Sequence, residues 1–159
     1  MGEPILEHEK IPVISKPDEQ GYTIAYEKDK EFKLKCVSMG NPHGVAIIND
    51  VKNFDVEKYG PGLEKNKIFP EKANIEFIRV VDRKTIEMRV WERGSGETLA
   101  CGTGACASAV ACILLGKTER NVEVRLLGGN LNIEWDENTN HVFMTGPAKT
   151  VFEGVWENN

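Results

Sequence analysis

The sequence predicts an α+β fold in which an antiparallel or mixed sheet curls as a barrel around one central buried helix. Most of the 159 residues form short apolar or alternating runs separated by turn residues, which is typical of strands. Ten of the eleven residues from 105 to 115 are apolar, and a helix that is apolar on all sides has to be buried. Because a chain of this length can enclose one core, we predict a single domain over residues 1–159.

The strands are expected in sequence along the chain, and two pairs of them should form antiparallel hairpins. One hairpin turns at Asp82-Arg-Lys and the other at Gly128-Gly-Asn, which is a strong hairpin signal. A looser turn, 136–140, precedes the last but one strand. The expected strands are residues 32–39, 44–49, 73–81, 85–91, 122–127, 131–135, 142–145 and 151–156.

Two helices are expected to interrupt the strands. Residues 54–65 fit a short amphipathic helix, which Gly60-Pro61-Gly62 should break or tighten. The apolar helix should begin at Cys101 or just after it and end near Leu115-Gly116-Lys117, a typical helix stop. Residues 10–20 contain two prolines and are expected to be a linker or an irregular entry into the domain.

Composition and charge exclude several classes of protein. A net charge of −5 argues against a nucleic-acid partner, and no stretch approaches the ~18 apolar residues of a membrane span. The N-terminus lacks the basic and apolar regions of a signal peptide, which indicates a cytoplasmic protein. The four cysteines lack the spacing of a zinc site and are expected to be reduced thiols, so no metal site is predicted.

The segment from Glu92 to Cys101 and on into the apolar helix carries the strongest signal of chemistry. Cys101 is placed at the start of that helix, where the helix dipole should favour the thiolate and make it a base or nucleophile. The amides of Gly102, Thr103 and Gly104 lack intrahelical acceptors and can bind a carboxylate. The alternative is that Cys101 is simply a small buried apolar residue, as we expect for Cys106 and Cys112.

Gly102-x-Gly104-x-x-Ala107 also satisfies the loose dinucleotide-binding pattern. That pattern requires a crossover from strand through helix to a parallel strand, with an acidic residue about twenty positions on. Glu123 has roughly this spacing, but residues 122–127 lead into a hairpin turn instead of a second crossover. We therefore interpret the match as a coincidence.

A second polar cluster lies between two expected strands at Asn41-Pro-His43. Taken alone, this cluster is more typical of a plain turn with a packed histidine. Glu92 and Arg93 fit either a solvated pair at a strand end or a functional pair, and Asn74 alone is uninformative.

Taken together, five ordered motifs resemble the diaminopimelate epimerase family, and the resemblance covers essentially the whole chain. They are Met-Gly-Glu-Pro at the start, Ser-Met-Gly-Asn-Pro-His at 38–43, Phe-Pro-Glu-Lys-Ala-Asn at 69–74, Glu-Arg-Gly-x-Gly-Glu-Thr-x-Ala-Cys-Gly-Thr-Gly at 92–104 and Met-Thr-Gly-Pro at 144–147. The resemblance implies an isomerase without a cofactor that interconverts LL- and meso-2,6-diaminopimelate for lysine and peptidoglycan precursor synthesis. Two cysteines, one on each of two similar lobes, move the α-proton.

The resemblance also implies a role for individual residues. Cys101 matches the catalytic cysteine of the second lobe. The remaining matches are Gly102 and Thr103 for the reacting carboxylate, Asn41, Asn74, Glu92 and Arg93 for substrate binding, and His43 and Glu92 for control of the thiol pKa values. Arg93 suits a carboxylate because its planar guanidinium can bind both oxygens at once.

The departures from the family are as informative as the matches. A complete member is nearly twice this length, and its first lobe carries the other cysteine in a Cys-Gly-Asn-Gly-type motif that this sequence lacks. We therefore expect the C-terminal lobe alone, a truncated domain that is inactive by itself and requires the missing N-terminal lobe as partner. A homodimer is a further possibility. The alternatives are a lobe of a sister racemase for proline or hydroxyproline, and a non-catalytic binding fragment.

Overall fold

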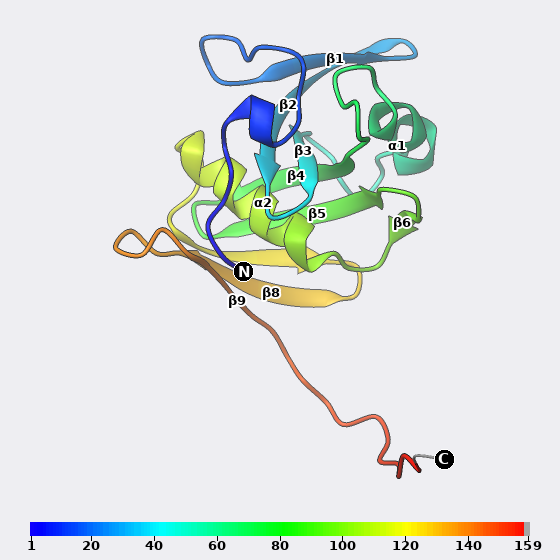
Figure 1. Ribbon diagram of the computed structural model, residues 1–159, viewed down its shortest axis with the longest axis vertical. Helices are drawn as coiled ribbons and strands as arrows, with labels where there is room; N and C mark the ends of the chain where they lie inside the picture. Colours follow the sequence, from blue (N-terminus) through cyan, green and yellow to red (C-terminus); the bar gives the residue numbers. More distant parts are fainter. Residues whose placement is uncertain (158–159) are drawn as a thin grey trace.

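The computed structural model describes residues 1–157 as a nine-stranded mixed sheet with one α-helix packed on each face (Figure 1). This confirms the predicted α+β class. The strands are β1 (Thr23–Glu27), β2 (Lys30–Ser38), β3 (Pro42–Ile47), β4 (Asn74–Asp82), β5 (Thr85–Glu92), β6 (Gly96–Thr98), β7 (Asn121–Leu126), β8 (Gly129–Trp135) and β9 (Val142–Thr145). The helices are α1 (Val56–Glu64) and α2 (Gly102–Leu114), and a 3₁₀ turn, η1, spans His8–Lys10.

The sheet runs in the order β1-β2-β3-β4-β5-β7-β8-β9, and β6 pairs with β5. Both predicted hairpins, β4 with β5 and β7 with β8, are antiparallel as expected. Two neighbouring pairs, β3 with β4 and β5 with β7, are parallel. Parallel neighbours need a crossover connection, and here α1 and α2 lie in these two connections. Although α2 joins two parallel strands, β7 then leads directly into the antiparallel hairpin with β8, as predicted.

The expected barrel is also wrong, because the sheet is open. Among residues 1–157, its edge strands β1 and β9 do not pair with each other. The N-terminal segment instead connects the two ends of the sheet: Ile5 forms a bridge with Ser38 at the end of β2, and Val142 N in β9 donates to Gly2 O. This segment runs past α2 in Figure 1. An irregular segment thus connects the two ends of the sheet, whereas in a closed barrel the first and last strands would pair directly.

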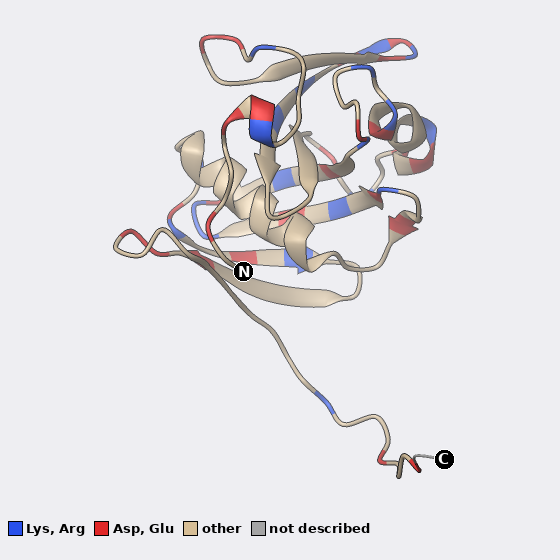
Figure 2. Ribbon diagram, viewed as in Figure 1, with Lys and Arg blue, Asp and Glu red and all other residues tan. Residues whose placement is uncertain are grey.

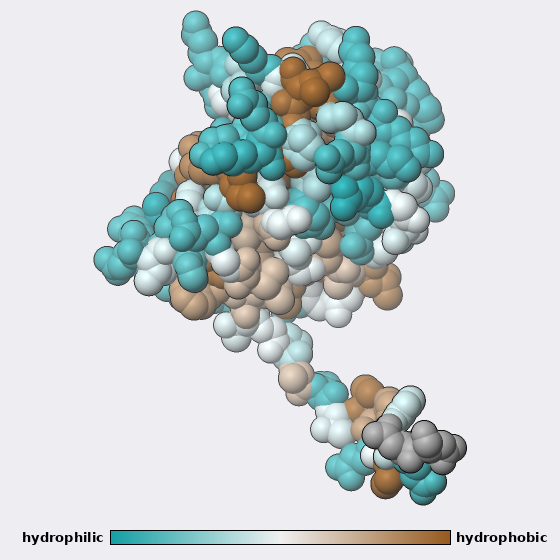
Figure 3. All heavy atoms as spheres, viewed as in Figure 1, coloured by the Kyte–Doolittle hydropathy of each residue, from teal (hydrophilic) through white to brown (hydrophobic). Residues whose placement is uncertain are grey.

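Helix α2 is buried, as its composition predicts. Its residues from Gly104 to Cys112 are all buried, and it packs on alternate residues of the neighbouring strands, including Val37, Ile78 and Val90. Figure 2 shows no charged residue along this helix. In the space-filling view the surface around it is pale or tan, whereas the upper part of the molecule is mostly hydrophilic (Figure 3).

Helix α1 closes a second core on the opposite face of the sheet. Asp55 caps it by accepting a hydrogen bond from Lys58 N at 2.9 Å, and its apolar side packs with Phe32 and Phe77. The helix continues through Pro61. A Cβ at Gly60 would lie 2.6 Å from the ring of Trp91, so glycine is needed for α1 to approach β5 this closely.

The predicted list of strands lacks two strands and contains one that does not form. Strands β1 and β6 were not predicted, although the irregular run before β1 was. The expected strand at residues 151–156 is absent: these residues extend away from the sheet (Figure 1), and Phe152 is 82% exposed. An apolar run forms a strand only beside a free strand edge, and this segment lies beside none.

Within residues 1–157, no helix is long and apolar enough to cross a membrane, and no group of three acidic, histidine or cysteine side chains could hold a metal.

Candidate active site

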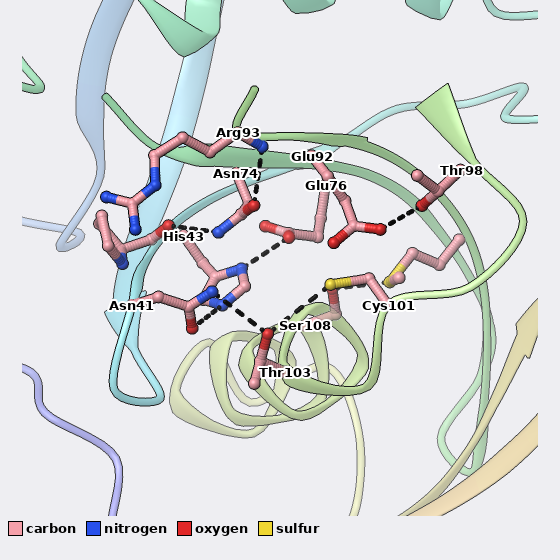
Figure 4. A network of polar contacts seen from close by, with 12 residues as sticks. Asn41, His43, Asn74, Glu76, Glu92, Arg93, Thr98, Cys101, Thr103 and Ser108 are labelled. Carbon is pink, nitrogen blue, oxygen red and sulfur yellow. Dashed lines mark hydrogen bonds and ion pairs between the residues drawn. The ribbon is translucent and has the colours of Figure 1, made fainter. Parts of the chain in front are cut away.

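The strand register brings the predicted site residues together where three neighbouring strands of the sheet begin or end. Since β3 and β4 are parallel, with His43 opposite Asn74, both strands begin on this side of the sheet. β5 is antiparallel to β4 and therefore ends there, at Glu92. Helix α2 begins at the same place, and Cys101 is its N-cap residue. Residues from the ends of β3, β4 and β5 thus surround the start of α2 (Figure 4).

Cys101 has extended backbone angles, with φ −139° and ψ 109°, and its side chain lies beside the first turn of α2. Its carbonyl oxygen accepts the first helical hydrogen bond, from Ala105 N at 2.9 Å. The backbone N–H groups of Gly102, Thr103 and Gly104 come before this bond, so they have no acceptor inside the helix and can bind an anion. The sulfur lies 3.6 Å from Thr103 Oγ1, and Cys101 is 7% exposed.

The burial of Cys101 works against the predicted thiolate form. Burial raises the pKa of the Cys101 thiol to about 11, and the nearby carboxylates Glu76 and Glu92 add to this rise. The Thr103 hydroxyl and the Gly104 backbone N–H lower the pKa, but less than burial raises it. Burial thus favours the thiol form more strongly than these two hydrogen-bond donors favour the thiolate.

A chain of polar contacts leads from the sheet to Cys101. His43 is fully buried, and its two ring nitrogens contact Glu76 Oε1 at 2.7 Å and Asn41 Oδ1 at 2.9 Å. Asn41 Nδ2 then donates to Thr103 Oγ1 at 3.4 Å, next to the sulfur. Four predicted residues, Asn41, His43, Cys101 and Thr103, are thus connected, with Gly102 at the start of the same helix.

Glu76 is the site residue that the sequence analysis missed. It lies in β4 on the face covered by α2, it is fully buried, and its Oε1 lies 2.7 Å from His43 Nδ1. A signal for it exists in the sequence: Ile75-Glu76-Phe77-Ile78 places one carboxylate inside an apolar strand, and buried carboxylates are rare unless they are paired.

Asn74, Glu92 and Arg93 lie beside this chain of contacts but are occupied elsewhere. Asn74 Oδ1 accepts from Arg93 N at 2.9 Å and its Nδ2 donates to Pro42 O at 3.1 Å, so its side chain ties together the ends of β3, β4 and β5. Glu92 accepts a hydrogen bond from the Thr98 hydroxyl. The exposed Arg93 guanidinium donates to Glu71 O at 3.1 Å and points away from Cys101 (Figure 4).

Replacing Gly104 by alanine is expected to destabilise the chain, although alanine normally favours a helix by up to ~1 kcal/mol over glycine. A Cβ at this position would lie 2.7 Å from Glu76 Oε1 and 3.2 Å from Cys101 Sγ, and both of these groups are buried. We expect the free energy of unfolding in urea to fall by about 1–3 kcal/mol. In the matched control Gly102→Ala, the new methyl group meets only the flexible Met144 side chain, so stability should not fall. A stabilised Gly104→Ala variant would contradict this packing argument.

The raised pKa also predicts how Cys101 reacts with iodoacetamide. With a pKa of about 11, only about one Cys101 side chain in a thousand is a thiolate at pH 8. The alkylation rate should therefore rise about tenfold per pH unit from pH 8 to pH 10. Cys101 should react first, because Cys36 is 3% exposed and both Cys106 and Cys112 are 0% exposed. A rate that levels off below pH 9 would instead restore the thiolate prediction.

Comparison with known proteins places these observations in a family. Residues 35–151 match the family model described as Diaminopimelate epimerase. A protein of Acetivibrio thermocellus called diaminopimelate epimerase is 59% identical over 156 residues, which cover 97% of this chain and 55% of that protein. A protein of the same name from Methanococcus maripaludis strain C6 is 53% identical over 154 residues, which cover 97% and 56%. The chain thus spans about half the length of the curated relatives it matches. A solved structure of a PhzF-family phenazine biosynthesis protein from Bacillus anthracis is 23% identical, with a TM-score of 0.48, and the match covers 77% of this chain and 37% of that one.

Proposed function

Since this chain belongs to the diaminopimelate epimerase family, we propose that it is one lobe of an isomerase that inverts an α-carbon of diaminopimelate by proton transfer. In this proposal Cys101 is one of two proton-transferring thiols, and the other comes from a second lobe. The same reaction would connect the chain to lysine biosynthesis and to peptidoglycan precursors, as the family resemblance implies.

The observation that carries the proposal is the position of the Cys101 sulfur beside the open first turn of α2. Removing the α-proton of an amino acid places negative charge on the carbon and on its carboxylate. Backbone N–H groups at a helix start stabilise such charge, and those of Gly102 and Thr103 are the available donors here. A carboxylate bound at these amides would hold its α-carbon near the sulfur.

The raised pKa of Cys101 supports a role as the proton donor in this step. As a buried thiol it can give a proton to the substrate carbon from one face, while the thiolate of the other lobe removes the proton from the opposite face. After this transfer Cys101 is a thiolate, which the Thr103 hydroxyl and the Gly104 N–H stabilise. Burial also excludes water, which strengthens both interactions.

The distal end of the substrate would be held by Asn41, Asn74 and Arg93. The Arg93 guanidinium is exposed and bonded only to a backbone oxygen among the described residues, so it can turn toward a carboxylate. Asn74 would act mainly by fixing the strand ends that carry the other two residues. A small cyclic amino acid has no distal amino-acid end, so these residues favour diaminopimelate over proline or hydroxyproline.

The 159-residue chain and a hybrid test this proposal together. The hybrid joins the part of the Acetivibrio thermocellus relative that this chain does not match to residue 1 of this chain. We expect the chain alone to leave LL-diaminopimelate unchanged in D₂O, and the hybrid to produce the meso form with deuterium at the inverted carbon. Turnover by the chain alone would show that no second lobe is needed. A folded hybrid that binds the substrate without inverting it would contradict the proposed reaction.

A further inference from the structure

His43 uses both of its ring nitrogens, and its surroundings fix where one proton lies. Asn41 Nδ2 faces Thr103 Oγ1 at 3.4 Å, so the amide oxygen of Asn41 faces His43 Nε2, at 2.9 Å. An amide oxygen can only accept a hydrogen bond. With the Asn41 amide in this orientation, His43 Nε2 carries a hydrogen.

The same argument constrains the contact between His43 and Glu76. With Nε2 protonated, the 2.7 Å contact from Nδ1 to Glu76 Oε1 holds one hydrogen. Either His43 is an imidazolium beside a carboxylate, or it is neutral beside a carboxylic acid. In both cases Nε2 donates to Asn41, so Glu76 maintains the direction of the whole chain of contacts.

This direction reaches the sulfur through Thr103. Because Thr103 Oγ1 accepts from Asn41, its own hydrogen is free to point to Cys101 Sγ at 3.6 Å (Figure 4). Burying Glu76 in this arrangement costs free energy, because its Oε2 has no hydrogen-bond partner within residues 1–157. A buried carboxylate oxygen without a partner requires an explanation other than stability.

We infer that Glu76 is a positioning residue for Cys101: by holding the Nε2-protonated form of His43, it orients Asn41 and Thr103 so that the threonine hydroxyl donates to the sulfur. Its meaning for catalysis depends on the proposed epimerase function. The hydrogen-bond arrangement itself does not, and it can be tested on the 159-residue chain.

The inference can be tested because Glu76 and Thr103 change the pKa of Cys101 in opposite directions. The groups that face Cys101 are the carboxylates Glu76 from β4 and Glu92 from β5, with the Thr103 hydroxyl and the Gly104 N–H from α2. His43 from β3 faces Glu76 and not the sulfur. The charge of Glu76 raises the Cys101 pKa, whereas the hydrogen bond from Thr103 lowers it by more. Removing only the charge of Glu76 should therefore accelerate alkylation of Cys101, and losing the Thr103 bond should slow it.

The experiment measures iodoacetamide alkylation of Cys101 at pH 8, by mass spectrometry of the peptide that contains it. In Glu76→Gln, the amide N–H can donate to His43 Nδ1 and keep Nε2 protonated, so we expect Cys101 to react at least as fast as in the unsubstituted chain. In Glu76→Leu, His43 is free to place its hydrogen on Nδ1, so we expect a reaction about threefold to tenfold slower. Thr103→Val should also be slower. If Glu76→Leu reacts faster than the unsubstituted chain, Glu76 acts through its charge alone and the inference is wrong.

A second measurement needs no variant and remains valid if Glu76→Leu does not fold. The ¹⁵N NMR shifts of the His43 ring in the unsubstituted chain should show a protonated Nε2. A ring protonated only at Nδ1 would overturn the inference. Neither measurement uses epimerase turnover, so an inactive hybrid would count against the proposed function and not against this role of Glu76.

Discussion

Replacing Cys101 by serine is expected to abolish the epimerase activity of the hybrid. General acid–base groups contribute about 10²–10⁴-fold to a rate, and we expect kcat to fall by at least this amount. The serine hydroxyl can occupy the same position at the start of α2 and bond to Thr103, but it is a far weaker acid than a thiol. It therefore cannot donate a proton to carbon and then remain as a stable anion.

The measurement is conversion of LL- to meso-diaminopimelate by the hybrid, with and without Cys101→Ser. Cys106→Ala is the matched control, because Cys106 lies one turn further along the same helix, is fully buried and has no role in the proposal. Both variants should unfold at urea concentrations near that of the unsubstituted hybrid. A Cys101→Ser hybrid that retains more than about a tenth of the activity would show that the proton donor of this lobe is another group.

The buried helix and the hairpins could be predicted from the sequence because each depends on local features. An apolar run without a polar face must be buried, and Gly128-Gly-Asn specifies a turn. The closed barrel could not be predicted reliably. Whether the sheet closes depends on which distant segments meet its edges, and here Ile5 and Gly2 bond to strands β2 and β9.

The site was predicted in part for a similar reason. Motif residues such as Asn41 and Cys101 stand beside recognisable helix or strand ends, so their neighbourhood could be inferred. Glu76 lies inside a strand, and its importance depends on the parallel pairing that places β4 next to His43. The thiolate prediction considered the helix end alone. The pKa of Cys101 also depends on burial and on two carboxylates that the fold brings to it.

Replacing His43 by alanine is expected to produce the largest loss of stability among single substitutions at the site. Both partners of the His43–Glu76 pair are fully buried. If His43 is the imidazolium, removing it leaves Glu76 as a buried carboxylate with no ion-pair partner. Removing one partner of a buried ion pair typically costs about 3–5 kcal/mol, and we expect the free energy of unfolding in urea at pH 7 to fall by this amount.

Two further variants separate the buried charge from the lost packing. His141→Ala removes the same ring from an exposed pair, in which the side chain of His141 is 51% exposed and its Nε2 lies 3.8 Å from Glu3 Oε1, so stability should change by less than about 1 kcal/mol. The double variant His43→Leu with Glu76→Leu replaces both buried polar groups by apolar ones and should recover most of the loss, since such replacements are often neutral. If the double variant is as unstable as His43→Ala, the cost comes from packing around the ring, and the unpaired carboxylate is not its cause.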